Sequence, residues 1–141
     1  MASWFADTSF WIGLSSRRDQ YHQRALEWHQ LVLRKRTPIV TTEAVLIEWL
    51  NALSDVSIRR IAAESYLRVR ADLRIEVVPI QHELMRSAVE LYHGRPDKRW
   101  SLTDCISFVV MGQRAMTEAL TTDRDFEQAG MKALMLSPPP A

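Results

Sequence analysis

The sequence predicts an α/β protein, a three-layer α/β/α sandwich around a short central parallel sheet. Short apolar runs, several of them β-branched, alternate along the chain with longer segments of helical character. Such alternation is typical of a parallel sheet with helices on both faces. The 141 residues, 47% hydrophobic and 25% charged, suffice for one compact domain with a sizeable core. We expect one domain over residues 1–137 and an irregular Pro-rich tail over residues 138–141.

The first part of the chain is expected to form a strand, a long helix and a second strand. The first strand covers about residues 3–6. The helix runs from about Asp19 to Arg36, because apolar positions recur along it and basic residues occupy its last turn. Pro38 ends this helix, and residues 39–41 form the second strand.

The middle of the chain is expected to add two helices and the clearest strand. One helix follows the second strand through Leu53. Ser57 is the expected N-cap of the next helix, which ends near Leu73. Residues 75–80 are mostly β-branched and are bounded by Pro79, so they are predicted to form a strand.

Two further helices and two further strands complete the prediction. Residues 81–93 are expected to be helical, and Gly94 is a suitable residue to end that helix. Ser101 should cap a helix that continues to about Arg114. The last two strand candidates are residues 119–121 and 133–136.

Composition narrows the possible classes of protein. The single cysteine, Cys105, excludes an internal disulfide and a Cys-rich zinc site. No apolar run approaches the ~20 residues that are needed to span a bilayer. The amino-terminal residues lack the basic segment and long apolar stretch of a signal peptide. We therefore expect a cytoplasmic protein that does not act at a membrane.

The net charge of +1 is uninformative, but the basic residues occur in clusters. Most clusters are expected to be solvated helix faces and helix ends. One cluster, which lies just before Asp104, is a candidate for holding the phosphate backbone of RNA. It consists of Arg95, Lys98 and Arg99. Trp11 and Trp100 lie close in sequence to acidic residues and are candidates for stacking on bases.

Four acidic residues each lie beside a different apolar run, with few basic residues next to them. They are Asp7, Glu48, Asp104 and Asp123. An ionised carboxylate is costly to bury unless it is paired or binds a metal. Asp7 and Asp123 follow predicted strands, and ligands bind at the carboxyl ends of strands in such sheets. We interpret the four acids as a shared cation site, and ligation by oxygen alone favours Mg²⁺ or Mn²⁺ over Zn²⁺.

Each acid also has a purely structural explanation. Asp7 and Asp123 could be helix N-caps. Asp104 could complete a capping box with Ser101, and Glu48 could lie on the surface of an amphipathic helix. Taken one at a time, these explanations are as good as the functional one. Two unit charges ~4 Å apart repel by about 4 kcal/mol at an effective dielectric of 20, so carboxylates that converge would need a cation or a proton.

Four motifs along the chain carry a resemblance to a known family. They are residues 5–9 (Phe-Ala-Asp-Thr-Ser), Thr41-Thr42 leading to Glu48 and Asn51, residues 101–105 (Ser-Leu-Thr-Asp-Cys), and residues 120–123 (Leu-Thr-Thr-Asp) followed by Asp125 and Phe126. In this order they resemble the PIN-domain ribonucleases, especially the VapC-type toxins of bacterial toxin–antitoxin pairs. The resemblance covers nearly the whole chain.

The resemblance implies a PIN-like nuclease domain over residues 1–137 and a Mg²⁺- or Mn²⁺-dependent endoribonuclease that hydrolyses RNA phosphodiester bonds. By position, the metal-binding catalytic acids would be Asp7, Glu48, Asp104 and Asp123. The supporting polar side chains would be Thr8, Ser9, Asn51 and Thr122. The expected partners are an RNA substrate, a second copy in a homodimer, and an antitoxin whose segment covers the helical region from Glu43 to Leu73 and blocks the site.

Two other functions stay open at this point. One is a non-catalytic RNA-binding or interaction module of the same fold, in which the acids are structural. The other is a metal-dependent phosphatase, which is disfavoured because no second acid follows two residues after Asp7. Metal binding without RNA cleavage would support the module, whereas metal-dependent cleavage would support the nuclease.

Overall fold

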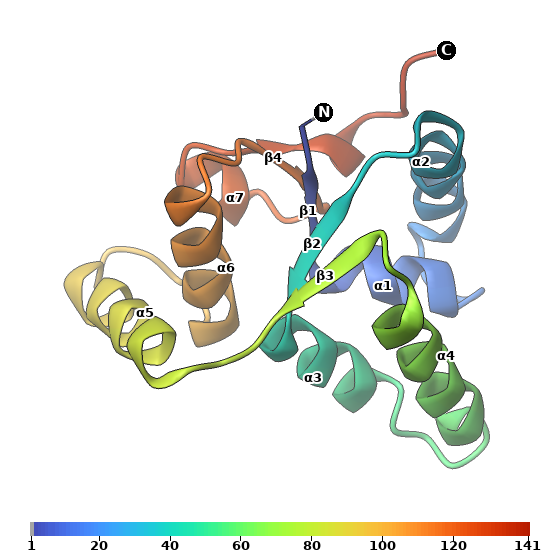
Figure 1. The fold of residues 1–141 in the computed structure, drawn as a ribbon, viewed down its shortest axis with the longest axis horizontal. Helices are drawn as coiled ribbons and strands as arrows, with labels where there is room; N and C mark the ends of the chain where they lie inside the picture. The colour runs from blue at the N-terminus through green and yellow to red at the C-terminus, as the bar shows by residue number, and fades with distance from the viewer. Residues whose placement is uncertain (1) are drawn as a thin grey trace.

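The computed structural model describes residues 2–141 and consists of a five-stranded parallel sheet with helices on both sides (Figure 1). The strand order is β3-β2-β1-β4-β5, and every neighbouring pair is parallel. Figure 1 shows α5 and α6 on one side of the sheet and α2 and α4 on the other. The predicted α/β class with a short parallel sheet is confirmed.

The strands begin and end close to the predicted runs, with the largest differences at β3 and β5. They are β1 (Trp4–Ala6), β2 (Ile39–Thr42), β3 (Ile75–Val78), β4 (Glu118–Leu120) and β5 (Lys132–Ala133). The third strand ends two residues earlier than predicted. Pro79 has no N–H to donate to a ladder, and the N–H of Ile80 donates instead to Oε1 of Glu43 at 2.7 Å.

The last strand is much shorter than the predicted range of residues 133–136. Only Lys132 and Ala133 belong to β5, and Leu134–Leu136 form a 3₁₀ helix. The N–H of Met135 donates to the carbonyl oxygen of Thr121 at 3.1 Å, so the chain turns across the end of β4. A hydrogen bond to the segment after β4 therefore replaces the ladder that the apolar composition suggested.

Seven helices lie within residues 2–141, and none is both long enough and apolar enough to cross a membrane. They are α1 (Thr8–Ser15), α2 (His22–Lys35), α3 (Glu43–Ala52), α4 (Arg59–Ala71), α5 (His82–Gly94), α6 (Leu102–Gln113) and α7 (Asp125–Gln128). The prediction of Ser57 as an N-cap is wrong, because its hydroxyl donates to Asp55 and Ile58 occupies the N-cap position. Gly94 lies inside α5, and Arg95 occupies the C-cap position.

The expected start of the long helix at Asp19 is also too early. One carboxylate oxygen of Asp19 accepts a hydrogen bond from the N–H of Tyr21 at 2.9 Å, which forms a turn before α2. Aspartate commonly forms such local bonds, and they compete with helical backbone bonds. The helix therefore begins after this turn, at His22.

The strand order reverses at β1 and β4, whose carboxyl ends lie side by side. The chain builds β1, β2 and β3 outward in one direction and then returns to add β4 on the other side of β1. Ala6 pairs with Leu120, and the N–H of Asp7 donates to the carbonyl oxygen of Leu120 at 3.1 Å. Such a reversal of strand order is where ligands bind in open α/β sheets. The segments that follow β1 and β4 carry Asp7 and Asp123.

The close packing of α1 against α2 generates a stability prediction. A Cβ atom added at Gly13 would lie 2.8 Å from Cβ of Ala25, whereas one added at Gly112 in α6 would meet nothing within 4 Å. Gly13→Ala should therefore lower the free energy of unfolding by about 1–3 kcal/mol through overpacking. Gly112→Ala is the matched control and should be neutral or stabilising by up to about 1 kcal/mol. Urea unfolding of both variants measures the difference, and equal stabilities would contradict this packing.

Candidate metal centre

Asp7 lies directly after β1, at the N-cap position of α1, and is 4% exposed. Its Oδ2 accepts a hydrogen bond from the hydroxyl of Thr121 at 2.8 Å. Burial raises the pKa of Asp7 to about 7, although hydrogen bonds from Thr121 and from the N–H of Thr8 lower it. The neighbouring carboxylates of Asp104 and Asp123 raise it further. Their repulsion indicates that these three acids, all predicted from the sequence, face a common site.

Asp104 combines a structural role with a position in the site. The N–H of Asp104 donates to Oγ of Ser101 at 3.0 Å, and the N–H of Ser101 donates to Oδ2 of Asp104 at 3.2 Å, which completes a capping box. This bond engages Oδ2 only. Burial raises the pKa of Asp104 to about 6, and the charge of Asp123 raises it further. The cap thus orients a carboxylate that a cation would stabilise.

A third and a fourth carboxylate follow β4. The N–H of Asp123 donates to the Thr121 hydroxyl at 3.0 Å, and the N–H of Asp125 donates to Oδ1 of Asp123 at 2.9 Å. Three carboxylates converge here, with one oxygen atom of each within 4.8 Å of the others; they belong to Asp104, Asp123 and Asp125. Burial raises the pKa of Asp125, and the charge of Asp123 adds to this rise. Asp125 was absent from the predicted site, although its place in an Asp-x-Asp motif after an apolar run is a signal for it.

Glu48 and Asn51 are not joined to this cluster by any hydrogen bond or ion pair within residues 2–141. Both side chains are exposed on α3. No hydrogen bond or ion pair of the described residues involves the Glu48 carboxylate, and Asn51 contributes only its carbonyl oxygen, to Ser54. A role for Glu48 as a metal ligand therefore stays a prediction.

Hydroxyl groups connect the two chain segments that carry the acids. The Thr121 hydroxyl contacts Asp7 Oδ2, the N–H of Asp123 and, at 3.2 Å, Oγ of Ser9. Oγ of Ser9 also accepts a hydrogen bond from the N–H of Thr122 at 3.1 Å. Ser9 therefore joins the segment after β1 to the segment after β4, and Thr122 takes part only through its backbone; a supporting role for either in catalysis stays a prediction. The sequence did not single out Thr121, because its importance depends on the register between β1 and β4.

Thr8, the remaining predicted polar residue, has an unusual environment. Its Oγ1 is buried. Among the buried side-chain N and O atoms of residues 2–141, it alone has no hydrogen-bond partner. An unsatisfied buried hydroxyl costs about 1–3 kcal/mol. This atom belongs to the residue next to Asp7, so the cost falls beside the proposed site.

The donor set fits a divalent cation that prefers oxygen. Asp104, Asp123 and Asp125 already converge, and Asp7 interacts electrostatically with two of them. Several ionised carboxylates so close together repel one another unless a cation or protons neutralise them. Carboxylates without Cys or His match the ligand preference of Mg²⁺ and Mn²⁺. Burial is the main cause of the raised pKa values of Asp7 and Asp104, and the neighbouring carboxylates raise both further.

The basic cluster predicted to bind RNA has two different environments. Arg95 forms two hydrogen bonds of 3.0 Å with the carboxylate of Asp97, and its guanidinium lies 5.2 Å from the centre of the Trp100 ring. Lys98 and Arg99 have no side-chain hydrogen bond or ion pair within residues 2–141. Trp11 and Trp100 are both buried, with 5% and 7% exposed, so the prediction that they stack on bases is wrong for this conformation.

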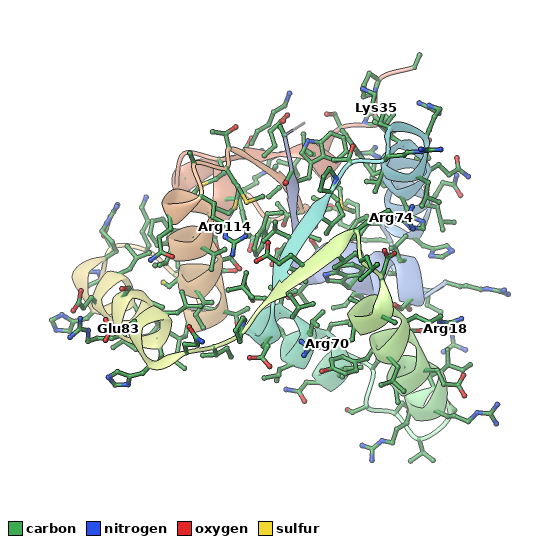
Figure 2. All side chains as sticks on the ribbon, viewed as in Figure 1. Arg18, Lys35, Arg70, Arg74, Glu83 and Arg114 are labelled. Atoms are coloured by element: carbon green, nitrogen blue, oxygen red, sulfur yellow. The ribbon has the colours of Figure 1, made fainter. Side chains whose placement is uncertain are left out.

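A groove of about 550 Å³ opens away from the acids, beside α1, α2 and α4. Its lining includes Trp11, His29, Leu33, Trp49, Arg68 and Arg74. Figure 2 shows Arg74 between α2 and α4. The walls of the groove are therefore largely apolar, and arginines lie around it.

Comparison with known proteins identifies the family. A model of the PIN domain family matches residues 4–132. The chain belongs to the PIN domain family. The 23S rRNA-specific endonuclease VapC20 of Mycobacterium tuberculosis, from strains CDC 1551 and H37Rv, is 30% identical over 127 residues, which cover 89% of this chain and 93% of the relative. The resemblance to VapC-type proteins that the sequence motifs indicated is confirmed.

A solved structure of the same relative supports the fold. The crystal structure of M. tuberculosis VapC20, described as a sarcin–ricin loop cleaving toxin, matches with a TM-score of 0.81 and 27% sequence identity. The match covers 93% of this chain and 98% of the VapC20 chain. The two proteins therefore share the PIN architecture over almost their whole lengths.

The raised pKa of Asp7 generates a prediction about pH. The carboxyl binds its proton more tightly in the folded state, with a pKa of about 7 against 3.8 for an ordinary Asp. Its contribution to stability therefore falls as pH rises from about 4 to 7, by up to about 4 kcal/mol. In EDTA, Asp7→Asn should remove this loss, so the variant should be more stable than the wild type at pH 8 but not at pH 4. Urea unfolding at both pH values checks this, and parallel pH profiles would contradict it.

The geometry of the cluster generates a prediction about metal affinity. Asp125→Asn should weaken Mn²⁺ binding by about tenfold or more, since even outer contacts of metal sites are worth about 10- to 100-fold. Glu48→Gln removes a charge of the same size and should have a smaller effect, because Glu48 is exposed and has no contact with the cluster. Isothermal titration calorimetry of both variants measures this order. A larger effect of Glu48→Gln would instead favour the ligand set that the sequence predicted.

Proposed function

We propose that this protein is a divalent-metal-dependent endoribonuclease and the toxin of a toxin–antitoxin pair. The observation that carries the proposal is the convergence of carboxylates from α6 and from the segment after β4 at the reversal of strand order. Membership of the PIN domain family and the similarity to a VapC20 endonuclease support it.

The metal would be Mg²⁺ or Mn²⁺, held by carboxylate oxygens. Asp104 would contribute Oδ1, because the capping box engages its other oxygen. Asp123, Asp125 and Asp7 would complete the acidic surface, and Glu48 would approach from the exposed side of α3. When bound, the ion supplies Lewis acidity, which lowers the pKa of a water molecule and stabilises the leaving oxygen.

The acidic side chains of the site would already be held in position before RNA binds. The Thr121 hydroxyl links Asp7 to the backbone of Asp123, so two acids from different strands keep a fixed separation. Preorganised groups of this kind need little rearrangement when charge develops in the transition state. A carboxylate of the cluster would accept the proton of the attacking water, and the 3′-oxygen of the preceding ribose would leave. The products would carry a 3′-hydroxyl and a 5′-phosphate, as the family resemblance implies.

The first RNA to test is the RNA on which the relative VapC20 is described as acting. VapC20 is described as specific for 23S rRNA and as cleaving the sarcin–ricin loop. We propose that this protein also cleaves RNA of the ribosome, because its similarity to VapC20 extends over 89% of the chain.

The proposed partners are an antitoxin and a second copy of the chain. The groove beside α4 includes Trp49 and Arg68 from the region predicted to be covered by the antitoxin, so we propose that an antitoxin segment with apolar and acidic side chains binds there. For a homodimer we propose the outer face of α5, where Val89 and Tyr92 are 45% and 54% exposed.

The proposed activity is tested with Asp104→Asn. The amide can still accept the hydrogen bond from Ser101, so the helix cap and the fold should be retained. Cleavage of 23S rRNA in Mn²⁺ should fall about 100-fold or more, because even a group that only supports a metal ligand is worth about 10- to 100-fold. Glu127→Gln is the matched control: it removes an acid from α7 outside the cluster and should cleave like the wild type.

Expression of the two variants provides a second measurement of the same activity. The wild type and Glu127→Gln should arrest growth when no antitoxin is present, whereas Asp104→Asn should not at matched soluble levels. Full activity of Asp104→Asn in both assays would contradict the metal mechanism. Mn²⁺ binding by the wild type without cleavage of any RNA would favour the non-catalytic module.

A further inference from the structure

The segment that joins α5 to α6 is held rigidly against the part of the chain that carries Asp125. Figure 1 shows it as the yellow to orange connection on the α5–α6 side of the sheet. Within it, the N–H of Lys98 donates to the carbonyl oxygen of Arg95 at 3.1 Å, and both 3.0 Å bonds of the Arg95 guanidinium go to Asp97. These contacts close a compact turn in which the charge of Arg95 is already paired with Asp97.

Trp100 fastens this turn to α7. Its indole N–H donates to Oε1 of Gln128, the last residue of α7, at 3.3 Å. The Trp100 ring packs edge-on against Phe108 with centroids 4.9 Å apart, and Phe108 packs in the same way against Phe126, also at 4.9 Å. Phe126 adjoins Asp125 in the sequence. The aromatic contacts therefore fix the position of the turn relative to the acidic cluster.

Lys98 is the cation that this arrangement places beside the acids. It lies three residues before Ser101, whose N–H donates to Oδ2 of Asp104 at 3.2 Å, and two residues before Trp100, which is bonded to α7 beside Asp125. The Lys98 side chain is half-buried, yet within residues 2–141 no carboxylate lies within 4.0 Å of its ammonium group. A lysine close to an acidic site but not paired with any of its carboxylates is available to an anion that enters the site.

We propose that Lys98 binds a phosphate of the RNA next to the metal centre, and that Arg95 is a positioning residue that holds Lys98 there. This inference rests on the proposed ribonuclease function. It divides the basic cluster: Lys98 touches substrate, whereas the guanidinium of Arg95 stays on Asp97 and Trp100. An RNA phosphate that approaches several carboxylates needs a nearby positive charge, and an ammonium group is suited to this as a point charge.

The first test is steady-state cleavage of a synthetic RNA hairpin carrying the sarcin–ricin loop, in Mn²⁺ and at several KCl concentrations. Lys98→Gln should raise KM about five- to tenfold and leave kcat within about twofold, because it removes one contact to the substrate. The salt slope of log kcat/KM should become shallower by about 0.7–0.9, the value for one phosphate contact. Lys98→Arg should restore both quantities, because it keeps the charge.

The matched control is Lys35→Gln. Figure 2 shows Lys35 at the end of α2, on the other side of the sheet from α5 and α6. This variant loses the same charge, so it should keep the wild-type KM and salt slope if position rather than net charge matters. A change equal to that of Lys98→Gln would overturn the proposal.

A double-mutant cycle tests the positioning role of Arg95. Arg95→Gln should also raise KM and reduce the salt slope, and Arg95→Lys should fail to restore them because an ammonium group cannot reproduce both bonds to Asp97. The double variant Arg95→Gln/Lys98→Gln should be no worse than Lys98→Gln alone, since Arg95 acts through Lys98. Additive effects would show that Arg95 contacts RNA itself and would overturn this part of the proposal.

The outcomes separate this inference from the proposed function. If the wild type cleaves the hairpin and Lys98→Gln has an unchanged KM and salt slope, the inference fails and the ribonuclease function stands. If the wild type cleaves neither the hairpin nor total bacterial RNA, the function and the inference fail together. Mn²⁺ affinity, measured by calorimetry, should be the same for Lys98→Gln and the wild type, so a large change there would assign Lys98 to the metal centre and overturn the proposal.

Discussion

The hydrogen bond between Thr121 and Asp7 is the interaction on which the acidic site depends. It joins the first residue after β1 to the first residue after β4, and the same hydroxyl accepts the N–H of Asp123. Asp7 is buried there at a cost, which appears as a pKa raised to about 7. A fold that keeps a carboxylate in such a place needs either a proton or a cation at that point. The parallel pairing of β1 with β4 imposes this need for a proton or a cation, because it brings the carboxyl ends of the two strands together.

Structural and chemical roles coincide in the acids of this site. Asp104 caps α6 through one oxygen and leaves the other for a cation. Asp123 accepts a backbone N–H through Oδ1, which turns the chain so that Asp125 joins the cluster. The sequence left a choice between a cap and a ligand open for Asp104, and the two roles are compatible, since the cap engages only Oδ2.

Much of the fold could be predicted because the signals are local. Apolar runs, Pro38 and the Ser101 cap located most elements to within a few residues, and the buried apolar run after Asp104 identified α6. The errors at the helix starts came from local bonds to Asp19 and Asp55, and the errors in the strands arose where non-local contacts decided the outcome. The bond from Met135 to Thr121 shortened β5, and the bond from Ile80 to Glu43 ended β3.

The site was only partly predictable for the same reason. Asp7 and Asp123 could be found because each follows an apolar run that ends at the same edge of the sheet, and Asp104 because it opens the apolar run of α6. Thr121 could not be found, since its role depends on strand register. Asp125 looked like a helix residue, and Glu48 was placed with the acids because it lies within an apolar run, although its side chain is exposed in this structure. Spatial convergence is a property of the sheet, which the order of residues does not specify by itself.

The most direct measurement of the central claim is a crystal structure of the protein grown with Mn²⁺, with anomalous scattering recorded at the manganese edge. We expect an anomalous peak at the carboxyl ends of β1 and β4, about 2.0–2.2 Å from carboxylate oxygens of Asp104 and Asp123. An anomalous peak elsewhere, or no peak at saturating Mn²⁺, would contradict a metal centre formed by these acids.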